Sequence, residues 1–150
     1  MRPPDARPIA RRTVALAVTL ALGAGGLATM PGQARADSCW VHNGSLMRLK
    51  AEGNRRWFFY EEPRETLRRA GVVPGTLLFD GVKQGNWYSG TSRVFSRFCA
   101  EDELPYAVEG PVRPDQLQVT LSGTREVQDR CQPTGRTTTD TLVFTYSHRC

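Results

Sequence analysis

The stretch 46-LMRLKAEGNRRWFFY-60 decides how this 150-residue chain folds. Its two runs, 46–51 and 55–60, are rich in apolar and aromatic residues, and the segment 52–54 (Glu-Gly-Asn) suits a tight turn because Gly and Asn tolerate a positive φ. The stretch therefore predicts an antiparallel hairpin. Aromatic residues fill the last four positions, and both faces of that strand carry rings because side chains alternate between faces. We expect one face in a core and the other covered or binding a partner.

Two later segments alternate apolar and polar residues with the period of a strand. They run over 117–122 and 142–147, and each predicts a strand with one buried and one solvated face. Shorter strand-like runs follow the same reasoning, with Gly, Pro, Asn and Asp between them as turn residues. These shorter runs lie at 76–79, 87–88, 92–99 and 106–109.

Two other segments have compositions that do not predict strands. The segment 64–70 contains good helix formers, with Pro63 before it, Arg near its end and Gly71 after it as a stop, so we expect one short helix. The segment 132–140 is polar and rich in Gly, Pro and Thr, and it predicts a loop.

About seven short strands at regular spacing, with one short helix, predict a mainly-β fold: a small antiparallel β-barrel or sandwich. The barrel is favoured because closure removes the exposed sheet edges that promote aggregation. In architecture alone, without a shared motif, this arrangement resembles the calycin-type barrels and the small exported lysozyme-inhibitor domains.

Residues 1–36 have the features of a cleaved signal peptide. A positive start with Arg11-Arg12 precedes the uncharged stretch 14–28 and the small-residue site 34–36 (Ala-Arg-Ala). The stretch is shorter than the roughly 20 apolar residues that span a membrane. We therefore expect a single exported domain, 37–150, that is periplasmic or extracellular and has no membrane span after cleavage. We favour the general secretory route, and the twin-arginine route stays open.

The net charge of +5 belongs mostly to this leader. Five Arg and one Asp lie within residues 1–36, so residues 37–150 carry a net charge of +1. Lys and Arg form no run there, and a nucleic-acid partner is not predicted.

All four cysteines lie in the predicted exported domain: Cys39, Cys99, Cys131 and Cys150. An even number in an exported domain indicates two disulfides, for which the sequence allows three pairings. We favour Cys99 with Cys131 and Cys39 with Cys150, because a meander that closes on itself places its first and last strands side by side. The spacing matches no paired C-x-x-C motif, so neither a metal site nor a cofactor is predicted.

Catalysis has few candidate residues. A small hydrolase would need a histidine base, either His42 with Ser45 nearby or His148 near the carboxyl end. No G-x-S-x-G nucleophile elbow occurs in the sequence. The hydrolase stays an alternative, and a structural envelope component is a second one.

Recognition is the favoured function, because aromatic residues and Arg are the usual anchors of interfaces. We expect a non-catalytic domain that binds an extracytoplasmic protein or a small ligand. The candidate binding residues are His42, Trp57, Phe59, Arg64, Trp87 and Tyr88.

Overall fold

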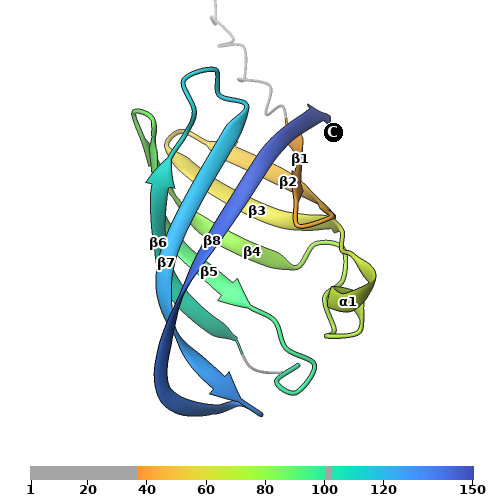
Figure 1. Cartoon of the computed structure of the whole chain (residues 1–150). Coiled ribbons are helices and arrows are strands. Elements are labelled where there is room, and N and C mark those ends of the chain that lie inside the picture. The colour runs from red at the N-terminus through yellow and green to blue at the C-terminus, as the bar shows by residue number, and fades with distance from the viewer. Residues whose placement is uncertain (1–36, 101–102) are drawn as a thin grey trace, which may run out of the picture. The chain divides into compact units, whose positions relative to one another are not determined.

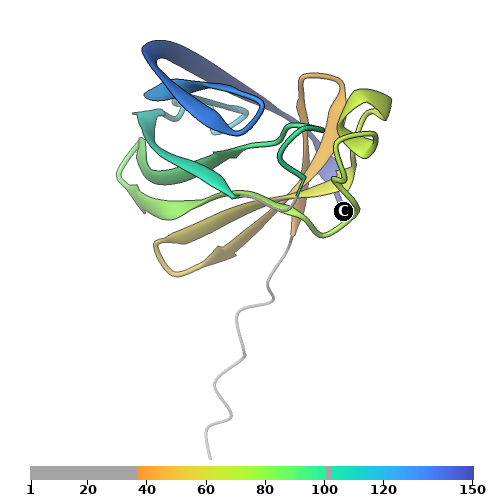
Figure 2. The same cartoon turned by 90° about the horizontal axis from the view of Figure 1, so that it is seen from below.

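The computed structural model describes residues 37–100 and 103–150, which belong to the second of two compact units, 33–150. They form a closed barrel of eight antiparallel strands (Figure 1). Each strand pairs with its neighbour along the chain, and β1 pairs with β8 to close the ring, as the view from below shows (Figure 2). The strands are β1 (Ser38–His42), β2 (Ser45–Glu52), β3 (Arg55–Glu62), β4 (Leu77–Gln84), β5 (Trp87–Val94), β6 (Leu104–Pro111), β7 (Gln118–Asp129) and β8 (Gln132–Arg149).

Up-and-down connectivity gives the barrel two distinct ends. We call one end the mouth: it carries the β1–β2, β3–β4, β5–β6 and β7–β8 connections, including α1 (Glu65–Arg68) between β3 and β4 (Figure 1). The opposite end, here the closed end, carries the other connections and the start and end of the described domain. The barrel prediction is thus confirmed, with eight strands instead of about seven.

Inward-facing apolar side chains fill most of the barrel. Phe58 of β3 stacks on Phe144 of β8 with ring centroids 4.0 Å apart, and Trp40 of β1 contacts Phe58 edge-on at 5.8 Å. Burial of such rings is the main source of stability in a domain of this size. The buried cluster comprises Trp40, Met47, Leu49, Phe58, Tyr60, Val72, Leu78, Phe79, Tyr88, Val108, Val112, Val119, Leu121, Leu142 and Phe144.

Two paired glycines let the barrel wall bend. Gly81 of β4 and Gly90 of β5 are cross-strand partners. A Cβ on Gly81 would lie 2.3 Å from the carbonyl oxygen of Ser89, and one on Gly90 would lie 2.2 Å from that of Asp80. Only glycine permits this close backbone approach, which is a common device for curving a sheet.

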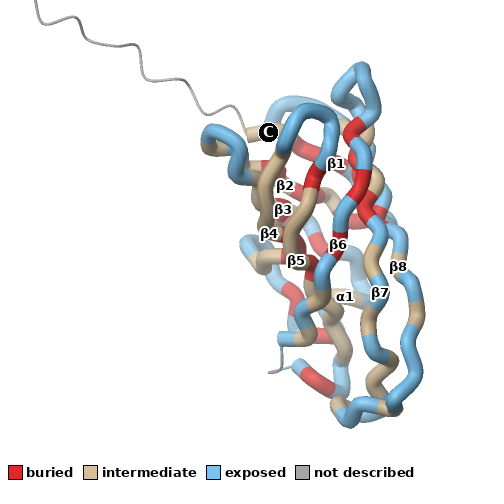
Figure 3. The backbone as a smooth tube through the Cα atoms, turned by 90° about the vertical axis from the view of Figure 1, so that its left-hand side faces the viewer, coloured by how far each residue is buried: buried red, intermediate tan, exposed pale blue. Residues whose placement is uncertain are grey.

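The prediction of a loop over 132–140 is wrong. These residues belong to β8 and pair with β7 down to Asp129↔Gln132. The composition misled because this end of the hairpin is largely exposed (Figure 3), so no buried face is visible as an apolar alternation. Its Thr residues favour strands, and the hydroxyls of Thr124 and Thr139 lie 3.3 Å apart across the pair.

Other element boundaries also differ. The predicted helix over 64–70 is shorter, since α1 covers Glu65–Arg68. β5 passes through Gly90 and ends at Val94, whereas the sequence predicts a break and a strand to residue 99. β1 was not predicted as a separate strand, because five residues are too few to establish a periodicity.

The two disulfides are the pairs that the sequence analysis favours. Cys39 bonds Cys150 with 5.1 Å between Cα atoms, and Cys99 bonds Cys131 with 5.4 Å. The first joins β1 to the residue after β8 at the closed end, and the second joins the β5–β6 and β7–β8 connections at the mouth.

The structure bears on the prediction of no membrane span but not on that of a signal peptide. Within residues 37–100 and 103–150, no helix is long and apolar enough to cross a membrane. The predicted signal peptide, residues 1–36, lies outside the described residues.

Candidate functional site

A cavity of about 310 Å³ lies at the mouth. Its lining residues are far apart in the sequence, because the closed barrel brings together residues of β1, β3, β4, β5, β6 and β8. The lining mixes apolar side chains with polar groups able to orient a ligand, as binding sites usually do. The residues are His42, Asn43, Tyr60, Arg64, Leu67, Leu78, Arg93, Val94, Phe95, Tyr106, Asp140, Thr141 and Leu142.

Ser92 is an unsatisfied polar group beside this cavity. Its side chain faces inward from β5, opposite the lining residue Tyr106 of β6, and it is fully buried. Its Oγ makes no hydrogen bond of ordinary geometry within the described part of the chain, although the Tyr106 hydroxyl is near enough for Ser92 to lower the pKa of that phenol. A buried hydroxyl without a partner is costly and rare, and it is a common sign of an absent ligand or water.

Two tyrosines add hydroxyl groups to the cavity. Burial raises the pKa of Tyr60 to about 12, and burial also raises the pKa of Tyr106. Both phenols are therefore neutral hydrogen-bond donors at neutral pH. The Tyr60 ring is held edge-on against Phe95, with centroids 5.8 Å apart.

One lining residue of the cavity, Asp140, belongs to an internal ion pair. Arg125 of β7 donates from Nε to Asp140 of β8, and both side chains are largely shielded from solvent. The Tyr106 hydroxyl interacts with the same carboxylate. Asp140 is thereby neutralised by a partner that the protein itself supplies.

His42 is a neutral, fully engaged imidazole. Its Nδ1–H donates to the Val143 carbonyl at 3.0 Å, its Nε2 accepts from Asn43 at 3.3 Å, and its ring stacks on Phe144 with centroids 4.6 Å apart. Burial lowers the pKa of His42. Both ring nitrogens are hydrogen-bonded within the protein. The imidazole therefore lines the cavity as a fixed ring, and neither nitrogen is free to act as a base.

The hydrolase alternative gains no support from this geometry. His42 and Ser45 are cross-strand partners, but Ser45 Oγ accepts a hydrogen bond from the Arg64 backbone N–H at 3.0 Å. The described residues include no hydrogen bond between His42 and Ser45. His148 is exposed near the closed end, with its Nδ1 3.0 Å from Ser147 Oγ.

Arg64 is the free cation of the mouth. Its guanidinium forms no ion pair with a described residue, whereas the other lining arginine, Arg93, is 2.7 Å from Asp80. After the effect of burial, the Arg64 charge acts on both His42 and Tyr60 by lowering their pKa values. With Asp140 already paired, the cavity keeps one positive charge without a partner.

The structure brings together two of the six candidate residues from the sequence, His42 and Arg64. Trp57 and Phe59 lie on the outer face of β3, where Trp57 packs under Lys50 and Arg55. Trp87 is 46% exposed at the closed end, and Tyr88 lies in the core beside Phe79. Their roles in binding stay predictions.

Sequence reasoning missed the polar interior. Tyr60, Tyr106 and Asp140 are separated by many residues, and only the closed barrel places them around one cavity, with Ser92 opposite Tyr106 on the neighbouring strand. The available signal was a polar residue at an inward position of a strand, and reading it requires the strand register.

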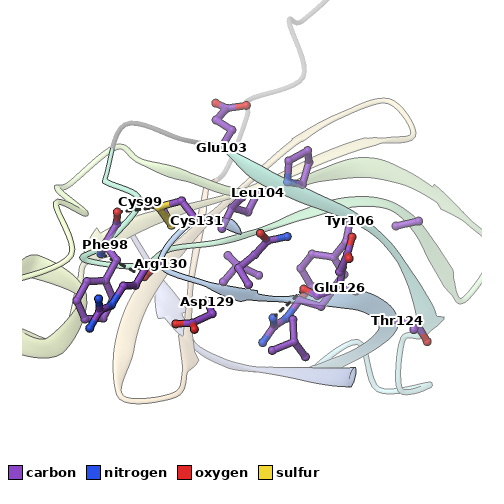
Figure 4. A pocket seen from close by; sticks show the side chains of 17 residues that line it. Phe98, Cys99, Glu103, Leu104, Tyr106, Thr124, Glu126, Asp129, Arg130 and Cys131 are labelled. Carbon is purple, nitrogen blue, oxygen red and sulfur yellow. Dashed lines mark hydrogen bonds between the residues drawn. A yellow bond between two sulfur atoms is a disulfide. The ribbon is translucent and has the colours of Figure 1, made fainter. Parts of the chain in front are cut away.

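A second cavity, of about 680 Å³, lies beside the first between β6 and β7 (Figure 4). We call it the side cavity. Val94 and Tyr106 line both cavities, and the Cys99–Cys131 disulfide lies in the wall of the side cavity (Figure 4). Among the described residues, no group of three or more His, Cys, Asp or Glu side chains could hold a metal ion.

Comparison with solved structures identifies similar barrels. The structure of the rhizavidin–biotin complex matches with a TM-score of 0.51 and 12% sequence identity, covering 77% of this chain and 94% of rhizavidin. Apo short afifavidin matches with a TM-score of 0.49 and 18% identity, covering 75% of this chain and 96% of that one. The likeness to rhizavidin concerns the fold. No protein-family model and no curated protein matches the sequence.

Proposed function

We propose that this chain is an exported, non-catalytic binding protein that holds a small organic anion in its mouth cavity. The observation that carries the proposal is the fully buried Ser92, whose Oγ has the Tyr106 hydroxyl near it but makes no hydrogen bond of ordinary geometry with a described residue, beside a cavity lined by two neutral tyrosines. A ligand with a polar group at this depth would satisfy that hydroxyl.

The charge of the mouth supports an anion. Arg64 is the lining cation without a carboxylate partner among the described residues, and its backbone is held by Ser45. A guanidinium is well suited to bind a carboxylate through two parallel hydrogen bonds. The volume of about 310 Å³ suits a compact molecule.

Two further observations concern the cellular compartment of the protein and the choice of the first ligand to test. Two disulfides with no free cysteine among the described residues support an oxidising compartment, periplasmic or extracellular. Rhizavidin, which has a similar fold, is known in a complex with biotin. Biotin carries a carboxylate, so we would test it first.

The test is calorimetric titration of the purified domain with biotin and with short monocarboxylates such as butyrate. Arg64→Gln should weaken binding about tenfold or more, and Ser92→Ala should weaken it less, because losing a charged partner costs more than losing a neutral one. Arg68→Gln is the matched control, since Arg68 lies nearby on α1, is exposed and pairs with Glu65. Equal weakening by Arg64→Gln and Arg68→Gln, or no binding of any acid, would contradict the proposal.

A further inference from the structure

We infer that the mouth cavity and the side cavity are two compartments of one site, which takes an amphiphilic anion with its carboxylate at Arg64 and its hydrocarbon tail in the side cavity. This inference rests on the proposed function, because the carboxylate is placed by the same Arg64. It adds the chemical class of the ligand.

The partition between the compartments consists of side chains. Asp140 lines the mouth cavity and Arg125 lines the side cavity, and the two form an ion pair. Tyr106 and Val94 line both cavities. Side chains change rotamer far more easily than paired strands separate, so a tail could pass by displacing the Tyr106 ring.

The side cavity lies where the barrel wall is least tightly paired. β6 and β7 pair at Glu109↔Ser122, with one further bridge at Val112↔Val119, whereas β7 and β8 pair along most of their length. The cavity is lined by 103–107 and 124–131, all on the mouth side of that pair. The opening is thus a property of strand pairing, and filling it would not require a strand to be displaced.

Part of the side cavity has apolar walls that a hydrocarbon tail could contact. Leu104 of β6, Val127 of β7 and Val94 of β5 give it apolar walls, and the ring of Phe98, 58% exposed, stands at one end (Figure 4). The Arg97 guanidinium lies over this ring, 4.7 Å from its centroid.

Charge fixes the orientation of the ligand. The side cavity has three carboxylates in its lining, Glu103, Glu126 and Asp129, of which Glu103 is 3.8 Å from Arg93. It also has two lining arginines, of which Arg125 is paired with Asp140 and Arg130 is exposed, so the carboxylates outnumber the arginines. An anionic head would be repelled there and attracted to the unpaired Arg64 at the mouth. The volumes, about 310 and 680 Å³, together reach the upper range of small-ligand sites.

The experiment is a chain-length series of butyrate, octanoate and dodecanoate, titrated below their micelle concentrations against the purified domain. The wild-type protein should bind dodecanoate at least about 100-fold more tightly than butyrate, because each buried methylene adds to the affinity. Val127→Trp, which fills the side cavity, should reduce this gain to about threefold or less and leave butyrate binding unchanged. Val143→Trp, on the outer face of β8, is the matched control and should keep the gain.

The outcomes separate the two proposals. If butyrate or biotin binds in an Arg64-dependent manner but affinity does not rise with chain length in the wild-type protein, this inference is wrong and the proposed function stands. If none of the acids binds, both are wrong. The wild-type series decides the matter even if Val127→Trp fails to fold.

Discussion

The apolar core and the mouth of this barrel are built from the same strands, yet their interiors differ in kind. Phe58 and Tyr60 face inward two residues apart on β3, and Phe58 stacks on Phe144 while the Tyr60 hydroxyl belongs to a polar cavity. The apolar side chains of the core are buried against one another. The mouth keeps a buried Ser92 hydroxyl that makes no hydrogen bond of ordinary geometry with a described residue, and an Arg64 cation that forms no ion pair with one. Stability is therefore expected from one region and recognition from the other.

The largest expected effect on the free energy of unfolding comes from removing the disulfide at either end of the barrel. Replacing Cys39 and Cys150 by Ser opens a loop of 111 residues and should lower the free energy of unfolding by about 5 kcal/mol. Replacing Cys99 and Cys131 by Ser opens one of 32 residues and should lower it by about 4 kcal/mol. Urea unfolding measures both. A greater loss at the mouth would show that the closed end is not the more stabilised region.

A pair of substitutions on β3 separates packing from recognition. Phe58→Ala should lower the free energy of unfolding by about 3 to 5 kcal/mol, because a fully buried ring leaves a cavity. Tyr60→Phe should lower it by less than about 1.5 kcal/mol, because the ring stays, but it should weaken binding of an organic anion. Denaturant unfolding and calorimetric titration on both variants test this, with Phe59→Ala on the outer face of β3 as the control.

The pH dependence of stability sharpens the comparison at the mouth. Burial lowers the pKa of His42 below its ordinary value of 6.5, so the unfolded chain binds this proton more readily than the folded one. The stabilisation is therefore complete above pH 6.5 and is lost as the pH falls below it. His42→Gln should flatten this part of the profile of unfolding midpoint against pH, and an unchanged slope would show that His42 is not responsible.

The smallest expected effect concerns the outer wall. Trp87→Ala should change the free energy of unfolding by about 0.5 kcal/mol or less, because the ring is 46% exposed, and Trp57→Ala should cost somewhat more. Neither should alter binding of a small acid at the mouth. If either variant instead loses a protein partner in a pull-down while the thermal midpoint is kept, the aromatic surface that the sequence suggested is a second binding region.

Much of the fold was predictable because it depends on local chemistry. The turn at 52–54 follows from Gly and Asn, and Gly53 has the positive φ of 56° that glycine adopts without strain. The alternation in 117–122 and 142–147 identified the inner faces of β7 and β8. The prediction of a loop over 132–140 was wrong because the prediction of a strand depends on a local apolar pattern. An exposed hairpin has no apolar face, so it shows no such pattern.

The sequence by itself determined a disulfide-bonded antiparallel barrel and directed attention to His42 and Arg64. Only the tertiary structure decided that Tyr60, Tyr106 and Asp140 surround one cavity, that His42 is held neutral, and that Tyr88 belongs to the core. The physical reason is register. A strand alternates inward and outward side chains whatever its partners are, but which inward positions meet across the barrel depends on the stagger of all eight strands, and that is settled by closure of the ring.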